Sequence, residues 1–154
     1  MAAKKRKSYF FGKLMLVIYI LFLFYFLLLS EAYGRTNELQ GYRYNLELFK
    51  EIRRFWNYRE QLGAFATIAN LFGNVLVFVP FGFLFPTAGK YHSFLKTAFY
   101  SLGLSFIVEV LQLFFKLGCF DVDDLLLNTI GGVLGYWAFL GFDRMRKRYA
   151  KKTR

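Results

Sequence analysis

Hydrophobic residues in this chain gather into four long runs that are separated by polar segments. The runs cover about residues 10–29, 68–85, 94–115 and 124–142. A helix needs about 20 mostly apolar residues to cross about 30 Å of hydrocarbon, and each run has roughly that length. The pattern therefore predicts an all-α polytopic membrane protein, a single domain over residues 1–154 with four transmembrane helices.

The first run could instead form a signal peptide. It follows a basic segment at residues 4–7, and Ser30-Glu31-Ala32 is a small-x-small sequence suited to cleavage. Its apolar part is long for a signal peptide, which favours a retained helix. Cleavage would leave the orientation of the other three helices unchanged.

Between the first two runs, apolar and charged residues alternate at helical spacing. The apolar residues are Leu48, Phe49, Ile52, Phe55 and Trp56, and the charged ones are Glu47, Lys50, Glu51, Arg53 and Arg54. This spacing predicts a short amphipathic helix in the membrane interface. A solvated helix packed on the ends of the bundle is the alternative.

Composition and charge support a membrane location. Hydrophobic residues make up 56% of the chain and aromatic residues 22%, and the formal net charge is +11. The basic residues flank the apolar runs, at residues 4–7 and in a basic tail over 143–154. This placement favours anionic lipid headgroups over nucleic acid as the partner. Because the chain has one cysteine and one histidine, Cys119 and His92, we expect no zinc or haem site.

The distribution of basic residues also predicts the orientation. With four spans, the side that holds both termini carries 14 Lys and Arg residues, and the other side carries 7. The positive-inside rule then places both termini in the cytoplasm and residues 31–67 outside. The expected location is the bacterial cytoplasmic membrane.

Given this orientation, the polar residues inside the runs lie at one depth, near the outer face. They are Asn70, Asn74, Glu109, Gln112, Asp123, Asp124 and Asn128. A charged carboxylate in the hydrocarbon centre costs at least about 2.5–3.5 kcal/mol, so such groups face the bundle interior or water. We expect these residues to line one cavity that is open to the outer side. Asp123 is the least aligned of them, because it lies about 100° from Asp124 around a helix.

Structural roles are the alternatives for the acidic residues. Asp121 or Asp123 could cap the fourth helix, and Asp124 could compensate its dipole. Glu109 could form a structural salt bridge with Arg53, Arg54 or Arg59.

The amides and glycines also have structural alternatives. Asn70 and Asn74 could link helices by hydrogen bonds, as polar residues in membrane helices often do. Gly131, Gly132 and Gly135 are better suited to close helix packing than to ligand contact.

Two kinds of function fit these residues. An enzyme acting on a lipid-linked or headgroup substrate would use Glu109 as a general acid or base. Asp123 and Asp124 would complete the acid-base pair or, with Asp121, bind a divalent cation; oxygen ligands favour Mg²⁺ or Ca²⁺.

A binding protein would use the same polar residues without turnover, and we place this hypothesis slightly ahead. It would hold a membrane lipid headgroup, a lipid-linked cell-wall precursor or a cationic peptide. The candidate binding residues are Asn70, Asn74, Gln112, Asn128, Arg53 and Arg54.

Motifs in residues 45–140 resemble the VanZ-like family. They are Asn45-Leu46-x-x-Phe49, Asn70-Leu71-x-x-Asn74-x-x-x-Phe78-x-Pro80-Phe81-Gly82-x-x-x-Pro86, Ser105-x-x-x-Glu109-x-x-Gln112 and Asp121-x-Asp123-Asp124-x-x-x-Asn128-Thr129-x-Gly131-x-x-x-Gly135. The family takes its name from a protein implicated in resistance to the glycopeptide teicoplanin, so the resemblance implies a role in the cell envelope. Cys119 and Phe120 depart from the pattern, because relatives often carry an arginine and a small residue there. A role of that arginine in phosphate or carboxylate binding therefore does not carry over.

Overall fold

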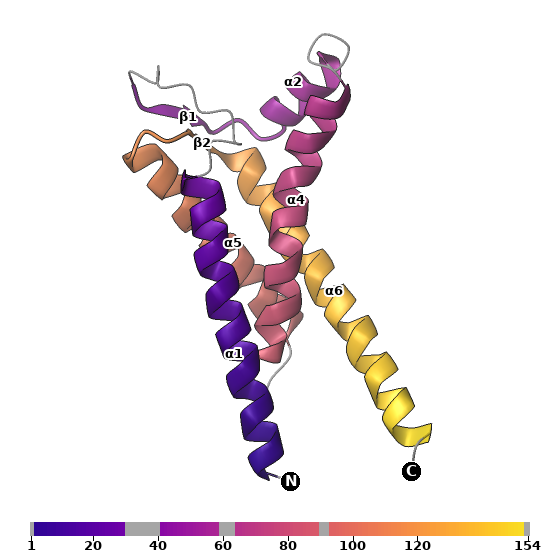
Figure 1. Ribbon diagram of the computed structural model, residues 1–154. Coiled ribbons are helices and arrows are strands. Elements are labelled where there is room, and N and C mark those ends of the chain that lie inside the picture. Colours follow the sequence, from indigo (N-terminus) through magenta and orange to yellow (C-terminus); the bar gives the residue numbers. More distant parts are fainter. Residues whose placement is uncertain (1, 30–40, 59–63, 90–92, 153–154) are drawn as a thin grey trace.

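A computed structural model of the chain describes residues 2–29, 41–58, 64–89 and 93–152 (Figure 1). Its elements, in chain order, are helix α1 (Ala2–Phe24), the π-helical segment η1 (Tyr25–Leu29), strand β1 (Arg43–Asn45), and helices α2 (Lys50–Asn57), α4 (Ala64–Thr87) and α5 (Phe94–Phe114), followed by strand β2 (Cys119–Asp121) and helix α6 (Val122–Lys152). The mostly helical fold agrees with the sequence prediction.

Three helical segments are long and apolar enough to cross a membrane: Tyr9–Leu28, Phe94–Phe114 and Val122–Lys152. The described apolar part of α4, Leu71–Thr87, is shorter. Within the described residues the structure therefore supplies three candidate spans, whereas the sequence predicts four.

The long helices alternate in direction along the bundle (Figure 1). Helices α1 and α5 run from the end that holds both chain termini toward β1, β2 and α2, and α4 and α6 run back. Both termini therefore lie at one end of the bundle, and the short elements lie at the other.

Glycines bring α4 and α6 into close contact. A Cβ atom at Gly131 or Gly135 would collide with carbonyl oxygens of α4, and one at Gly82 would collide with the backbone of α6. Gly132 packs instead against Ser101 of α5. These glycines serve helix packing, because only a residue without a side chain lets the backbones approach this closely.

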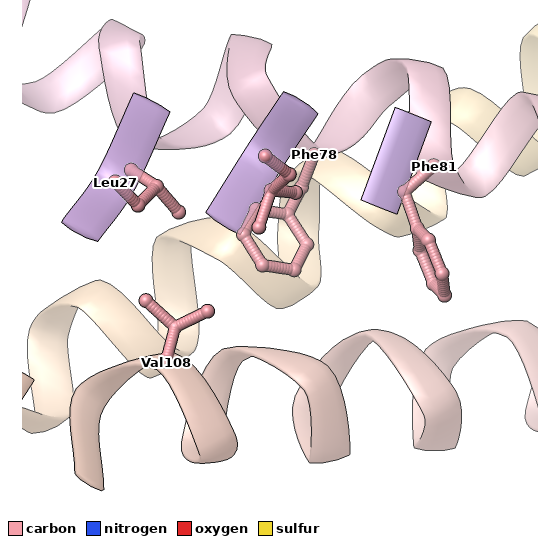
Figure 2. Close-up of a cluster of buried hydrophobic side chains, with 5 residues drawn as sticks. Leu27, Phe78, Phe81 and Val108 are labelled. Carbon is pink, nitrogen blue, oxygen red and sulfur yellow. The ribbon is translucent and has the colours of Figure 1, made fainter. Parts of the chain in front are cut away.

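The apolar core lies where α1, α4 and α5 meet. It consists of Leu23, Leu27, Phe78, Phe81 and Val108 (Figure 2). Alongside this core, the Tyr19 hydroxyl donates a hydrogen bond to the carbonyl of Val77, which joins α1 to α4. The core thus fixes α1, the most peripheral apolar helix, on the remaining bundle.

Two features depart from the predicted all-α architecture and its boundaries. β1 and β2 pair in parallel, with Tyr44 opposite Phe120. Helix α6 continues to Lys152, beyond the apolar run that ends at about residue 142 and through most of the basic tail. The extension has a local cause, because Asp143 forms ion pairs one turn ahead with Arg146 and Lys147.

Candidate functional site

One face of α5 carries a column of buried polar side chains. The members are Thr97, Ser101, Ser105, Glu109 and Gln112. Glu109 is only 2% exposed. As expected from the sequence, Glu109 and Gln112 face the bundle interior. Ser101 and Ser105 of this column contact α6, at Gly132 and Asn128.

Asn128 of α6 meets this column near its middle. Its Nδ2 atom donates a hydrogen bond of 2.8 Å to Ser105 Oγ. Its Oδ1 atom is buried and has no hydrogen-bond partner among the described residues. Because residues four apart share one helix face, Glu109 and Asp124 lie one turn from Ser105 and Asn128, on the side of β2.

Asp124 links α6 to α4. Its Oδ1 atom accepts a hydrogen bond from Asn74 Nδ2. Asn74 is buried, whereas Asp124 is partly exposed. Asn74 thus links two helices, as one of the sequence hypotheses expected, and the side chain of Asn70 lies outside the described part of the structure.

Glu109 receives a backbone donor rather than an arginine. Its Oε2 atom accepts a hydrogen bond of 3.0 Å from the Asp121 N–H. No ion pair joins Glu109 to Arg53 or Arg54 in the described structure, and Arg59 lies outside it. Within the described residues, the alternative of a structural salt bridge from Glu109 to Arg53 or Arg54 is therefore not realised.

Asp121 connects the start of α6 with strand β1. Its Oδ1 atom accepts hydrogen bonds from the Asp123 N–H at 2.8 Å and from Asn45 Nδ2 at 3.0 Å. The first bond caps α6, as the capping alternative predicted. Burial raises the pKa of the Asp121 carboxyl above its ordinary value, although both hydrogen bonds oppose this shift.

Asp123 caps a different helix, α2. Its Oδ1 atom accepts from the Phe49 N–H, and its Oδ2 atom accepts from the N–H groups of Glu51 at 2.9 Å and Ile52 at 3.2 Å. The side chain is fully buried. Phe49 adopts a left-handed conformation with φ of 66°, which is uncommon for a residue with a side chain. Asp123 therefore holds α2 against the start of α6.

Gln112 and the two arginines have separate surroundings. Gln112 Nε2 donates a hydrogen bond of 3.0 Å to the Leu27 carbonyl, near the end of η1. Arg53 and Arg54 are exposed on α2, and Arg54 pairs with Glu51 at 3.0 Å. No described hydrogen bond or ion pair joins these arginines to the carboxylates of α5 and α6.

The expected divalent-cation ligands do not form a metal centre in the described structure. Among its residues, no three carboxylate, thiol or imidazole groups come together in a way that could hold a metal ion. Both oxygens of Asp123 already bind backbone N–H groups, and Asp121 Oδ1 accepts two hydrogen bonds.

Sequence reasoning did not include Asn45 and Ser105 among the candidate site residues. Each belongs to a motif noted above, and Ser105 also falls on the polar stripe of α5. The pairing of Asn45 with Asp121 joins residues far apart in the chain, so local spacing contains no signal for it. The signal for Ser105 was present, since it lies four residues before Glu109 on the same face.

Apolar helices with buried carboxylates and amides toward one end define a helical integral membrane protein. The sequence pattern of the VanZ/LLP1 family matches residues 16–143, and the chain belongs to this family, as the resemblance predicted. It is 35% identical over 99 residues to Protein VanZ of Enterococcus faecium. This match covers 58% of the chain and 62% of the relative, which is less than two thirds of the relative's length. No solved structure matches the chain.

Proposed function

We propose that the protein spans the bacterial cytoplasmic membrane four times, with both termini in the cytoplasm. Helix α4 has 24 residues, and its length of about 36 Å would suffice for a fourth crossing. An even number of crossings agrees with the position of both termini at one end of the bundle (Figure 1). The excess of basic residues on that side supports a cytoplasmic location. In this orientation β1, β2 and α2 would lie at the outer face, with α2 in the interface.

At the outer face, the protein would bind a lipid headgroup or a lipid-linked cell-wall precursor and thereby reduce susceptibility to teicoplanin-type glycopeptides. Family membership and the relative named Protein VanZ support a role in the cell envelope. The observation that carries the binding proposal is the buried Oδ1 atom of Asn128, which has no partner in the described structure. A buried polar atom without a partner is costly, so a bound group that supplies a donor would be favoured there.

Binding is favoured over turnover because two of the candidate catalytic or metal-binding carboxylates have structural roles. Asp123 binds three backbone N–H groups of the α2 region, and Asp121 caps α6 and holds Asn45. The enzyme hypothesis gave Asp123 and Asp124 the role of acid-base partner to Glu109 or, with Asp121, of metal ligands, and Asp123 and Asp121 accept capping hydrogen bonds instead. Glu109 and Asp124 are the acidic side chains of the cluster that do not cap a helix.

Antibiotic susceptibility tests this proposal. The chain is expressed in a glycopeptide-susceptible bacterium, and the minimal inhibitory concentration of teicoplanin is compared with that of an empty vector. We expect the wild-type protein to raise this concentration and Glu109→Gln to return it to the vector value at unchanged membrane abundance. Glu47→Gln makes the same chemical change on an exposed residue and serves as the control. Full protection by Glu109→Gln would refute the proposed role of the carboxylate.

A further inference from the structure

The cluster formed by Glu109, Asp124 and Asn128 offers hydrogen-bond acceptors and negative charge without a matching cation. The described ion pairs lie elsewhere, on α2 and near the end of α6. Glu109 and Asn128 are each 2% exposed. The carboxyl groups of Glu109 and Asp124 are close enough to repel one another. Two negative charges in such a poorly solvated place are energetically unfavourable.

The amide of Asn128 adds an acceptor that points to a ligand. Its Nδ2 atom donates a hydrogen bond to Ser105 Oγ, whereas its Oδ1 atom has no partner among the described residues. Side chains of an α-helix lean toward the helix N-terminus. In α6 that end carries Asp124, so the Asn128 amide leans toward the level of the two carboxyl groups.

Resting on the proposed function, we infer that this cluster binds a protonated primary amine. A primary ammonium group carries three N–H donors, one positive charge and no acceptor. Its three N–H groups thus match the two carboxyl groups and the Asn128 carbonyl oxygen in number, and its charge compensates one carboxylate. Asp124 is the partly exposed member of the cluster, so the amine would enter from its side.

Two other occupants satisfy the cluster less well. A divalent cation needs six or more oxygen ligands or several retained waters, and the described residues hold no suitable ligand group. A water molecule would supply a donor to Asn128 Oδ1 but would leave the negative charge uncompensated. The amine can come from an amino-lipid headgroup or from a diamino acid in a lipid-linked precursor, because both carry the same group beside a lipid.

Native mass spectrometry of the full-length protein can test the inference. Phosphatidylethanolamine is competed against its mono-, di- and trimethylated forms, which lose N–H donors one at a time. A second arm competes a lysine-containing lipid-linked precursor against the same precursor acetylated on the lysine amine. A hydrogen bond to a charged group is worth about 1.5–3 kcal/mol, so we expect at least about a tenfold preference for the free amine in one arm. The arm that shows the preference identifies the source.

Variants locate the site. Glu109→Gln and Asp124→Asn should each abolish the preference, whereas Glu47→Gln should leave it unchanged. Equal binding of amine and methylated or acetylated forms by the wild-type protein in both arms would overturn the inference, and this measurement needs no variant. A preference that persists in both variants would also overturn it, because the amine would then bind elsewhere. The two proposals can fail separately. If the wild-type protein shows no amine preference but still protects against teicoplanin, and Glu109→Gln does not protect, the amine inference is wrong and the proposed function stands.

Discussion

Replacing Asp123 by alanine should release α2 from the bundle. In the structure this carboxylate accepts hydrogen bonds from the N–H groups of Phe49, Glu51 and Ile52. The first N–H groups of a helix have no partner within the helix, so they depend on such an acceptor. Alanine removes the acceptor and also the negative charge that stabilises the helix N-terminus.

The size of the effect can be bounded from these contacts. Removal of an ordinary N-cap costs about 0.5–2 kcal/mol, and one hydrogen bond to a charged group is worth about 1.5–3 kcal/mol. The released N–H groups can regain water once α2 opens, so the cost stays below the sum of the bonds. We expect α2 to open more readily by about 2–3 kcal/mol, which is about 30- to 160-fold in the opening equilibrium. Asp123→Asn keeps one acceptor oxygen and should show a smaller effect.

Hydrogen exchange measured by mass spectrometry in nanodiscs reports this opening. In Asp123→Ala, peptides that cover residues 49–57 should exchange faster by the same factor as the change in the opening equilibrium of α2. The exchange rate of peptides from α5 should change little. Glu51→Ala is the matched control, because it removes an ion pair to the exposed Arg54 whose loss costs at most about 1 kcal/mol. Unchanged exchange of 49–57 in Asp123→Ala would show that the carboxylate does not hold α2.

Three further predictions concern packing, a helix end and topology. Gly135→Ala should lower the thermal unfolding midpoint, because a Cβ atom there meets the α4 backbone and overpacking costs about 1–3 kcal/mol; Gly141→Ala, with open space around it, should not. Lys116→Gly should stabilise the protein by about 0.5–1 kcal/mol in the same assay, since residue 116 has φ of 56° after the end of α5, and Lys116→Ala should give no gain. A C-terminal reporter that is active only in the cytoplasm should be active, and activity of an exclusively extracytoplasmic reporter at that position would contradict the proposed orientation.

The sequence predicted the positions of the long helices well because lipid-facing helices need long apolar runs. The run at 94–115 corresponds to Phe94–Phe114, and the run at 10–29 corresponds to Tyr9–Leu28. The inward-facing stripe of α5 was predictable for a similar reason, since polar side chains avoid lipid and repeat at helical spacing. The extension of α6 past residue 142 was not predicted, because local ion pairs rather than apolar residues continue the helix there.

Contacts between distant segments were the part that the sequence could not predict. The parallel pairing of Arg43 with Cys119 depends on where the two loops meet, and each strand has only three residues. For Asp123, the sequence raised capping as an alternative but placed the cap on its own helix. The short helix expected around residues 48–56 corresponds in position to α2, and its placement in the membrane interface stays a prediction.

The separation of Asp123 from Asp124 follows from helix geometry and explains why neighbouring acids have different surroundings. Successive residues of an α-helix are rotated by about 100°, so two adjacent carboxylates point to different neighbours. Asp123 turns toward α2, where three backbone N–H groups and the positive end of the helix dipole compensate its charge. Asp124 turns toward α4 and α5, where Asn74 supplies one donor and Glu109 adds a second acid. At the start of α6, Asp123 thus holds α2 in place. Asp124 instead faces the cluster with Glu109 and Asn128, which has no cation among the described residues.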